Sequence, residues 1–221
     1  MSRVPRPSSW RPSATWRSAR CSRRTRTAPG ADQRAIDERI WNLFGEQWAV
    51  MFTDLSGFSR RVAEFGIIHF LQIIHESQRI LVPCIEAHDG ILLKNEGDSL
   101  LVIFRSAQKA IDCALAMQRA AADYNRGREQ AEHVLLCVGL GFGEVLRIGD
   151  RDVFGAEVNA AAKLGEDTAK AWEILVTDAV RTAVSETLSA DLAFEPIDTI
   201  PPGAEAAHRL RYELRPPGSR R

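Results

Sequence analysis

The chain has 221 residues, of which 45% are hydrophobic, and its 29 basic side chains balance 29 acidic ones. This length allows one domain with a core of its own, and the ordinary hydrophobic content excludes a fibrous or wholly disordered protein. The sequence contains no run of 18 apolar residues and no secretory leader, so we expect no membrane span and no membrane partner.

The even charge balance conceals a basic N-terminal segment. Residues 1–31 hold eight of the 29 basic side chains, all arginines, and no acidic one, which leaves 21 basic and 29 acidic side chains in the remainder. The segment is rich in serine and proline and has no apolar period, so we predict a disordered tail. Its composition also resembles an organelle transit peptide, and arginine clusters can contact nucleic acid. We rank nucleic-acid binding through this tail last among the functional alternatives.

Hydrophobic periodicity predicts a lead-in helix over residues 32–46 and a domain over residues 47–214. Within the domain, the expected helices cover 59–65, 67–88, 107–124, 154–169 and 179–184. The expected strands cover 47–53, 91–94, 100–104, 134–145 and 174–176, with two further extended segments at 192–197 and 209–214. The order β-α-α-β-β-α-β is that of a ferredoxin-like α+β domain with a C-terminal extension. We expect a polar tail at 215–221.

The four cysteines give an expectation about the cellular compartment. Cys21, Cys84, Cys113 and Cys137 show no paired spacing and mostly lie within apolar segments. Buried thiols of this kind are typical of a reducing environment, in which disulfides are rare. We therefore predict a cytoplasmic protein.

Two aspartates are the strongest candidates for a functional site. Asp54 follows the strand 47–53, and Asp98 lies between the strands 91–94 and 100–104, so we expect both in turns at strand ends. Hard cations such as Mg²⁺ bind a few such carboxylates together with the phosphate oxygens of a substrate. The pair therefore predicts phosphoryl or nucleotidyl transfer. Taken singly, each aspartate is better explained as a turn former beside a glycine.

A polar face is predicted for the helix that follows Gly155. Asn159 and Lys163 are spaced i, i+4, so both side chains project from one side of the helix. The packed side consists of small and apolar residues, namely Val158, Ala161, Ala162 and Gly165. This arrangement directs both polar groups toward a cleft.

Three glycines in the pattern Gly139-x-Gly141-x-Gly143 invite comparison with a dinucleotide-binding loop. The pattern lies within a predicted strand, lacks the spacing of the third glycine and is not followed by a helix start. We therefore do not predict dinucleotide binding.

Two segments are similar to the metal motifs of one family, namely Phe52-Thr-Asp54-Leu-Ser-Gly57-Phe58-Ser59 and Gly97-Asp98 with the hydrophobic strand after it. From about Trp48 to Val180 the chain resembles the class III nucleotidyl cyclase catalytic domain of adenylate and guanylate cyclases. The resemblance implies that Asp54, the carbonyl of Leu55 and Asp98 bind two Mg²⁺ or Mn²⁺ ions. It also implies that backbone amides around Gly57, Phe58 and Ser59, at a helix start, bind phosphate oxygens.

The resemblance assigns base recognition to Lys94 and Asp152, which stand where adenylate cyclases place a lysine and an aspartate against the adenine edge. Adenine N1 accepts a hydrogen bond and its N6 amine donates one, whereas guanine presents the opposite pattern. ATP is therefore preferred over GTP. Without the resemblance, Lys94 is explained as a solvated hairpin lysine and Asp152 as a turn former.

The resemblance also implies catalytic roles, with three departures from the family pattern. Asn159 would orient the ribose, and Lys163 stands in place of an arginine that stabilises the pentavalent phosphorus. Lysine lacks the planar fork of arginine, so we expect a weaker transition-state contact. Glu144 occupies the place of an arginine that contacts phosphate in many relatives. The family's Lys-Gly-Lys before the last strand is missing, and Arg209 or Arg211 is the candidate substitute.

The activity that the resemblance implies is conversion of ATP to 3′,5′-cyclic AMP and pyrophosphate by in-line attack on the α-phosphorus. It also implies a homodimer with shared active sites, because family members take the base-binding pair from one protomer and the metal-binding pair from the other. Lys94 and Asp98 of one chain would then serve opposite sites. The first alternative is a catalytically weak or inactive domain that acts as a nucleotide-binding regulatory dimer. The second is a guanylate cyclase.

Overall fold

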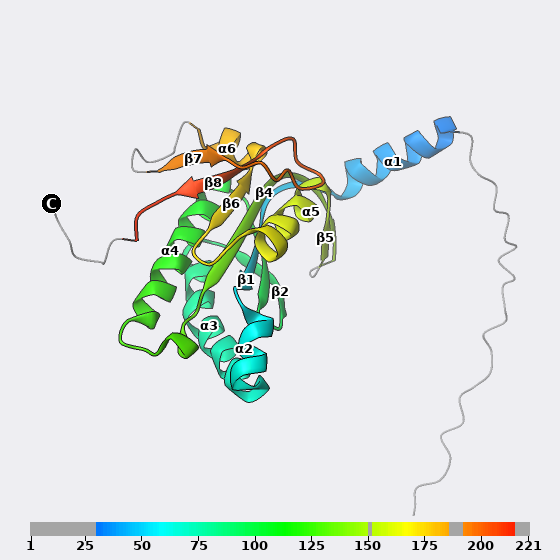
Figure 1. Ribbon diagram of the computed structural model, residues 1–221. Coiled ribbons are helices and arrows are strands. Elements are labelled where there is room, and N and C mark those ends of the chain that lie inside the picture. The colour runs from blue at the N-terminus through cyan, green and yellow to red at the C-terminus, as the bar shows by residue number, and fades with distance from the viewer. Residues whose placement is uncertain (1–29, 150–151, 186–191, 215–221) are drawn as a thin grey trace, which may run out of the picture. The chain divides into compact units, whose positions relative to one another are not determined.

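The computed structural model describes residues 30–149, 152–185 and 192–214 (Figure 1). The predicted tails at 1–31 and 215–221 therefore lie outside the described residues, except that Gly30 and Ala31 begin helix α1 (Gly30–Phe44). Residues 1–37 and 38–221 form two separate units, and the second unit carries the elements described below. None of the described helices is both long enough and apolar enough to cross a membrane.

A sheet of eight strands forms the centre of the second unit in its described part (Figure 1). The strands are β1 (Gly45–Leu55), β2 (Ile91–Glu96), β3 (Ser99–Phe104), β4 (Leu136–Ile148), β5 (Asp152–Phe154), β6 (Ile174–Thr177), β7 (Ala193–Pro196) and β8 (Ala207–Arg211). They lie in the order β2-β3-β1-β4-β6-β8-β7, and β5 pairs with β4 outside this path. β1 is antiparallel to β3 and β4, whereas β4 and β6 are parallel. The predicted α+β class and the order β-α-α-β-β-α-β are confirmed, with the short β5 as an addition.

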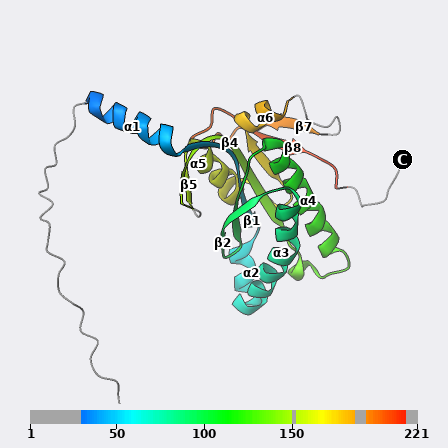
Figure 2. The same ribbon diagram turned by 180° about the vertical axis from the view of Figure 1, so that it is seen from behind.

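Helices cover both faces of this sheet (Figures 1 and 2). They are α2 (Phe58–Phe65), α3 (Ile67–Ala87), α4 (Ala107–Asn125), α5 (Ala156–Ala162) and α6 (Asp178–Val184), with a 3₁₀ turn at Gln130–Glu132. α3 and α4 pack on one face, where Phe70 and Ile111 belong to the larger core cluster. α5 packs on the other face, where Val158 and Ala161 join a second cluster.

The central strand β1 is buried on both faces. Ala49 and Met51 belong to the cluster beside α3 and α4, whereas Trp48 and Val50 belong to the cluster beside α5. A strand covered on both sides needs no polar alternation, which explains the continuous apolar run in the sequence. Because successive side chains alternate between faces, Asp54 shares the α5 face with Val50.

The helix predicted over residues 154–169 starts too early, and its C-terminal part is a π-helix that ends at Thr168. Phe154 is part of β5 and pairs with Leu146 of β4, so α5 begins only after Gly155. After Ala162 the chain widens into a π-helical segment, Lys163–Thr168. A strand of three residues carries too little periodicity to be recognised, and a wide helical turn changes the apolar spacing only slightly.

Contacts between backbones explain the glycines of β4. A Cβ atom on Gly139 would lie 2.3 Å from the backbone nitrogen of Gly165, and one on Gly141 would lie 2.4 Å from the carbonyl oxygen of Glu157. A Cβ atom on Gly165 would lie 2.7 Å from the carbonyl oxygen of Phe52. The glycine pattern therefore lets α5 and the π-helical segment lie directly on β4 and β1. The glycines serve this packing within a strand and do not form a dinucleotide-binding loop.

Candidate functional site

The structure brings Asp54 and Asp98 together. Asp54 is the next-to-last residue of β1, and Asp98 lies in the turn between β2 and β3. β1 and β3 are paired antiparallel with Thr53 opposite Leu100, so the end of β1 lies beside the start of β3. The Asp98 carboxylate lies close enough to that of Asp54 for its negative charge to raise the pKa of Asp54. The turn predicted for Asp54 is corrected, because the strand continues through Leu55.

The surroundings of Asp54 disfavour its negative charge. Burial raises the pKa of Asp54, and the negative charge of Asp98 raises it further, to about 7. A hydrogen bond with the backbone of Leu55 acts in the opposite direction. Two adjacent carboxylates in a partly desolvated place are costly unless a cation or a proton neutralises them.

This pair of carboxylates fits a divalent cation. Both supply hard oxygen ligands of the type that Mg²⁺ and Mn²⁺ prefer. Among the residues that the structure describes, no group of three or more His, Cys, Asp or Glu side chains could hold a metal. A cation at Asp54 and Asp98 would therefore complete its shell with backbone oxygens, water or substrate phosphates. The assignment of the Leu55 carbonyl as such a ligand stays a prediction.

The raised pKa of Asp54 predicts how the metal-free chain responds to pH. Between the ordinary pKa of 3.8 and about 7, the folded chain keeps a proton on Asp54 that the unfolded chain has lost. The folded state then binds more protons, so its stability falls as the pH rises through this window. With a chelator present, we expect the Tm of the wild type to fall from pH 4 to pH 7 relative to that of Asp54→Asn. Mn²⁺ should reduce the difference, and a constant offset at all pH values would contradict the prediction.

The predicted phosphate-binding amides lie at the start of α2. Gly57 precedes the helix with a φ of 84°, and Phe58 and Ser59 are its first two residues. Gly57, the N-cap residue, has no side chain that could cap these amides. Exposed amides at the N-terminus of a helix attract phosphate oxygens. Phosphate binding by this turn stays a prediction.

An ion pair joins Lys94 and Asp152, the two residues assigned to base recognition. Lys94 Nζ and Asp152 Oδ1 lie 2.5 Å apart, and their side chains are 37% and 44% exposed. The hydrogen bond to Asp152 raises the pKa of Lys94, which therefore stays charged. Asp152 lies in β5, not in the turn that would explain it without the family resemblance, and the ion pair connects this short strand to β2 at the edge of the sheet. The two predicted partners are thus adjacent and reachable by a ligand.

Asn159 and Lys163 are exposed on one side of α5 and the π-helical segment, as the i, i+4 spacing predicts. Val158, Ala161 and Gly165 are buried on the packed side, and Ala162 is half-buried. Lys163 donates from Nζ to Oδ2 of Asp167 at a distance of 2.7 Å. In the described part of the chain, neither side chain forms a hydrogen bond or an ion pair with Asp54 or Asp98. Their catalytic roles stay predictions.

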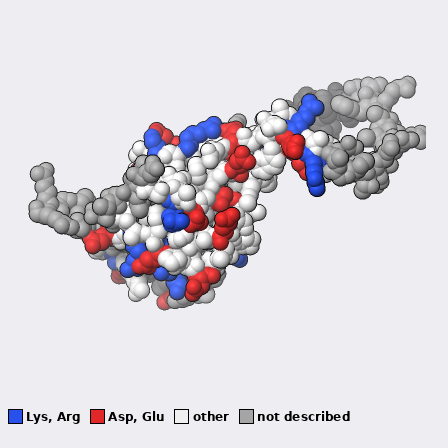
Figure 3. All heavy atoms as spheres, turned by 90° about the horizontal axis from the view of Figure 1, so that it is seen from above, with Lys and Arg blue, Asp and Glu red and all other residues white. Residues whose placement is uncertain are grey.

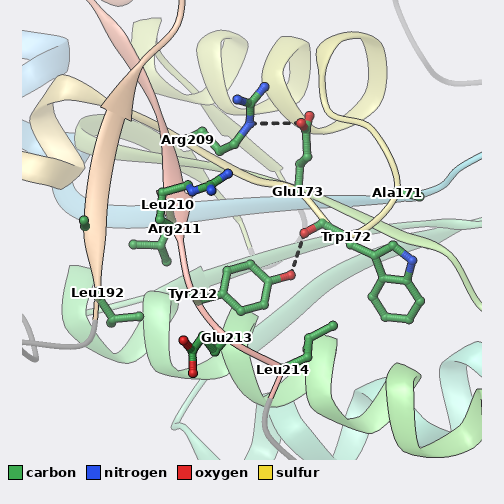
Figure 4. Close-up of a pocket in the computed structure, with 11 residues that line it drawn as sticks. Ala171, Trp172, Glu173, Leu192, Arg209, Leu210, Arg211, Tyr212, Glu213 and Leu214 are labelled. Carbon is green, nitrogen blue, oxygen red and sulfur yellow. Dashed lines mark hydrogen bonds and ion pairs between the residues drawn. The ribbon is translucent and has the colours of Figure 1, made fainter.

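The candidate substitutes for the missing lysine are engaged elsewhere. Arg209 Nε lies 2.9 Å from Glu173 Oε1, and Arg211 Nε lies 3.3 Å from Glu195 Oε1. Both arginines line a cavity of about 700 Å³ that also includes Trp172 and Tyr212 (Figure 4). Figure 4 shows the Tyr212 hydroxyl, which donates to the Trp172 carbonyl oxygen at 2.5 Å. The residues assigned to metal and base binding do not line this cavity. Glu144, the second departure, is exposed on β4.

Two acidic residues near the predicted site were missed by sequence reasoning. Burial raises the pKa of the Glu166 carboxyl, with smaller contributions from the negative charges of Asp167 and Asp98, and Asp167 pairs with Lys163. Their only sequence signal is two consecutive carboxylates at the end of a predicted helix. That signal is typical of a solvated helix face and does not indicate a site.

The surface of the second unit shows no broad basic area on the face seen from above. Acidic and basic side chains are interspersed there (Figure 3). Nucleic-acid binding requires a concentrated positive surface, so this face does not favour it. The arginine-rich residues 1–29, on which that alternative rested, lie outside the described part of the chain.

A comparison with known protein families shows which family this chain is related to. The family model for the adenylate and guanylate cyclase catalytic domain matches residues 45–201, which is more than half of the chain. The chain belongs to this family. The resemblance inferred from the motifs is confirmed, and this cyclase domain includes all ten predicted site residues from Asp54 to Lys163 within the matched range.

Individual relatives agree with this membership. A Rhizobium meliloti (strain 1021) protein provisionally named adenylate cyclase 3 is 31% identical over 136 residues, which are 62% of this chain and 23% of that protein. An adenylate cyclase of Streptomyces coelicolor (strain A3(2)) is 30% identical over 158 residues, which cover 67% of this chain and 37% of the relative. The chain thus spans less than two fifths of the length of either protein.

A solved structure shares the fold of this cyclase domain. It is an adenylate/guanylate cyclase/hydrolase from Silicibacter pomeroyi, with a TM-score of 0.65 and 25% sequence identity, and the match covers 75% of this chain and 96% of that one. The names of these proteins refer to both adenylate and guanylate cyclases. They do not decide between ATP and GTP, and that choice depends on the side chains of this cyclase domain.

Proposed function

We propose that this cyclase domain converts ATP to 3′,5′-cyclic AMP and pyrophosphate. The observation that carries the proposal is the ion pair between Lys94 and Asp152, which places a donor and an acceptor 2.5 Å apart. Adenine presents an acceptor at N1 beside a donor at N6, which match these two groups. Guanine presents the opposite pattern and would leave both protein groups without partners, so the pair favours ATP.

Asp54 and Asp98 hold the divalent cations in this proposal, together with the carbonyl of Leu55. Two Mg²⁺ or Mn²⁺ ions held there would make the ribose 3′-hydroxyl more acidic and would stabilise the negative charge of the departing pyrophosphate. The amides of Gly57, Phe58 and Ser59 orient the phosphates. The 3′-oxygen forms a bond to the α-phosphorus while the bond to the bridging oxygen of pyrophosphate breaks, and the hydroxyl proton passes to water.

Asn159 orients the ribose and Lys163 stabilises the charge that develops on the α-phosphoryl group in this proposal. Lys163 is paired with Asp167 in the free chain, but both side chains are at least half exposed. An exposed i, i+4 pair on a helix contributes only about 0.5 kcal/mol, so a triphosphate can displace Asp167 from the lysine. The lysine is therefore available to substrate, although its contact is weaker than that of an arginine.

The proposed assembly is a homodimer with two shared sites. The family resemblance implies this dimer, and a solved guanylyl cyclase domain of the same fold is dimeric. Large apolar side chains of this cyclase domain are exposed, among them Ile68 and Leu71 of α3 and Phe154 of β5. Apolar surface of this kind can be covered by a second copy. Each site would take Lys94 and Asp152 from one protomer and the aspartate pair from the other.

We also propose that the reaction takes place in the cytoplasm. Cys84, Cys113 and Cys137 are free thiols. Burial raises the pKa of the Cys113 thiol to about 12 and that of the Cys137 thiol to about 12, which makes both unreactive. Buried free thiols are typical of a reducing compartment.

The test compares products from ATP and GTP. The full chain with Mn²⁺ should form cyclic AMP from ATP faster than cyclic GMP from GTP, and Lys94→Glu should lower ATP turnover about 100-fold, because the adenine N1 then meets a carboxylate. Lys109→Glu is the matched control, since Lys109 is an exposed lysine that forms an ion pair with Asp89 on another part of the surface. If both variants lost the same fraction of ATP turnover, the change in charge alone would explain the loss, and the result would not support a base contact of Lys94. Faster GTP turnover by the wild type would favour the guanylate cyclase alternative.

One set of observations favours the second candidate, a nucleotide-binding regulatory dimer. Lys163 replaces the usual arginine, Glu144 is a carboxylate, and Arg209 and Arg211 hold carboxylates of their own chain. A folded dimer that binds ATP with a measurable Kd but forms no cyclic nucleotide would identify this function.

A further inference from the structure

Glu157 directs its carboxylate from helix α5 toward the sheet. Its Oε2 atom accepts one hydrogen bond from the backbone amide of Phe142 in β4 at 3.1 Å and another from the Thr177 hydroxyl at 2.7 Å. Thr177 is the last residue of β6 and is fully buried. The second residue of α5 therefore connects this helix to two neighbouring parallel strands.

Two glycines of β4 leave the space that Glu157 occupies. A Cβ atom on Gly141 would lie 2.4 Å from the Glu157 carbonyl oxygen and 3.0 Å from its Oε2 atom. A Cβ atom on Gly143 would lie 2.9 Å from the Glu157 Cγ atom. A larger residue at either place would displace Glu157, so the glycine pattern of β4 fits both the backbone and the side chain of this residue.

The two hydrogen bonds offset the cost of removing the Glu157 carboxylate from water. Burial raises its pKa, and the hydrogen bonds from Thr177 and Phe142 lower it. An acidic side chain in the first turn stabilises a helix even when it points into solvent, so the stability of α5 alone does not require the inward orientation. The inward carboxylate instead holds the start of the helix at one place on the sheet, and its removal would leave two donors without this acceptor.

The start of α5 lies between two residues of the proposed nucleotide site. Asp152 begins β5, which ends at Phe154 and is followed by Gly155 and then by α5. Asn159 comes two residues after Glu157, which is a rotation of about 200° around the helix, so its side chain points away from the sheet and is exposed. The helix start that Glu157 holds is thus the part of the chain that joins the proposed base contact to the proposed ribose contact.

We propose that Glu157 is a positioning residue for nucleotide binding, which aligns Asp152 with the base and Asn159 with the ribose. It does so by joining the start of α5 to β4 and β6, without touching the nucleotide itself. The inference rests on the proposed function, because it concerns the same nucleotide site. A displacement of about 1 Å in groups that orient a substrate can lower a rate about 100-fold.

Asn125 provides a matched control, because it also joins a helix to another part of the chain through two hydrogen bonds. Its Nδ2 atom donates to the Val134 carbonyl oxygen at 2.9 Å, and its Oδ1 atom accepts from the Val134 amide at 2.8 Å. Asn125 is buried at the end of α4, which packs on the opposite face of the sheet from α5. Asn125→Ala therefore removes the same number of hydrogen bonds but leaves the start of α5 undisturbed.

The experiment measures cyclic AMP formation by the full chain with Mn²⁺ and, by calorimetry, the binding of 3′-deoxy-ATP, which cannot cyclise. We expect Glu157→Ala to raise the KM for ATP and the Kd of the analogue about tenfold and to lower kcat about 100-fold. Glu157→Gln should stay within about fivefold of the wild type, because its amide oxygen can accept both hydrogen bonds. Asn125→Ala should lower the Tm but change KM and kcat less than about twofold.

The KM distinguishes positioning from stability. A smaller folded fraction lowers the apparent kcat and leaves the KM unchanged. The same kinetic changes in Glu157→Ala and Asn125→Ala would overturn the proposal, and so would a loss in Glu157→Gln as large as that in Glu157→Ala. Circular dichroism checks the folding of each variant. If Glu157→Ala does not fold, Thr177→Val replaces it, because this change removes one of the two hydrogen bonds; a raised KM supports the proposal and a wild-type KM overturns it.

Failure of the proposed function gives a different result. A wild-type chain that binds 3′-deoxy-ATP but forms no cyclic nucleotide overturns the cyclase activity alone. The Kd values of the Glu157 variants then test the positioning role, which an unchanged Kd in Glu157→Ala would overturn. A wild-type chain that does not bind the analogue overturns both proposals.

Discussion

Replacing either Asp54 or Asp98 with alanine should lower the rate of cyclic AMP formation at least about 1000-fold, because metal coordination contributes several kcal/mol to a phosphoryl-transfer transition state. The end of β1 lies beside the turn between β2 and β3, and the charge of Asp98 raises the pKa of Asp54, so each variant removes half of one proposed cation site. The base-binding pair, Lys94 and Asp152, is left intact. We therefore expect the loss mainly in kcat, with ATP binding in the absence of metal nearly unchanged.

The controls for this result distinguish the site from a general loss of charge. Asp123→Ala removes an exposed carboxylate on α4, on the opposite face of the sheet, and should keep the wild-type rate. The rates are measured by chromatographic separation of product with purified full-length chains at saturating Mn²⁺. If Asp98→Ala retained a tenth or more of the activity, the cation would have to be held by other groups, and the proposed mechanism would be wrong.

The sequence predicts the parts of the fold that depend on long periodic segments. The apolar runs of β1 and β4 and the amphipathic pattern of α4 each extend over ten residues or more, so a shift of a few residues at either end does not hide them. The short helix predicted over 59–65 ends where α2 ends, directly before Gly66, which has a φ of 84°. These elements carry the order from which the cyclase fold follows.

The aspartate pair and the lysine–aspartate pair could be predicted from the sequence for two different reasons. Asp54 and Asp98 each adjoin a strand whose position is evident, so their proximity follows once those strands pair. Lys94 and Asp152 were found through family resemblance, since nothing local in the sequence links β2 to the three-residue β5. Their ion pair depends on the position of the β4–β5 hairpin relative to β2, and the periodicity of the sequence does not predict that position.

The interactions that the sequence did not reveal are made by long side chains whose partners depend on tertiary placement. Arg209 and Arg211 could equally reach phosphates or carboxylates, and the structure pairs them with Glu173 and Glu195. The helix widens after Ala162, and the widened turn lies directly against Gly139 of the sheet. The π-helical turn and the backbone contacts that it requires are properties of the packed layers rather than of the local sequence.

A mixture of two inactive variants should recover activity if the sites are shared between protomers. In the proposed homodimer, Asp54 belongs to the metal half of one site and Asn159 to the opposite half of the other. A heterodimer of Asp54→Ala and Asn159→Ala has both changes in one site and none in the second, so that second site is complete. Random exchange makes half of the dimers mixed, so an equimolar mixture should reach about one quarter of the wild-type rate.

The comparison with a variant of the same half-site makes this result decisive. Asp54→Ala mixed with Asp98→Ala must stay inactive if Asp54 and Asp98 act in the same half-site, because every site in a mixed dimer then lacks one carboxylate. Subunit exchange is verified by two affinity tags on the same mixtures. Recovery with Asn159→Ala but not with Asp98→Ala places the two halves of the site on different protomers. Absence of recovery in a verified heterodimer would instead place Asp54 and Asn159 in one chain's own site, and the exposed apolar residues of α3 and β5 would then need a different explanation.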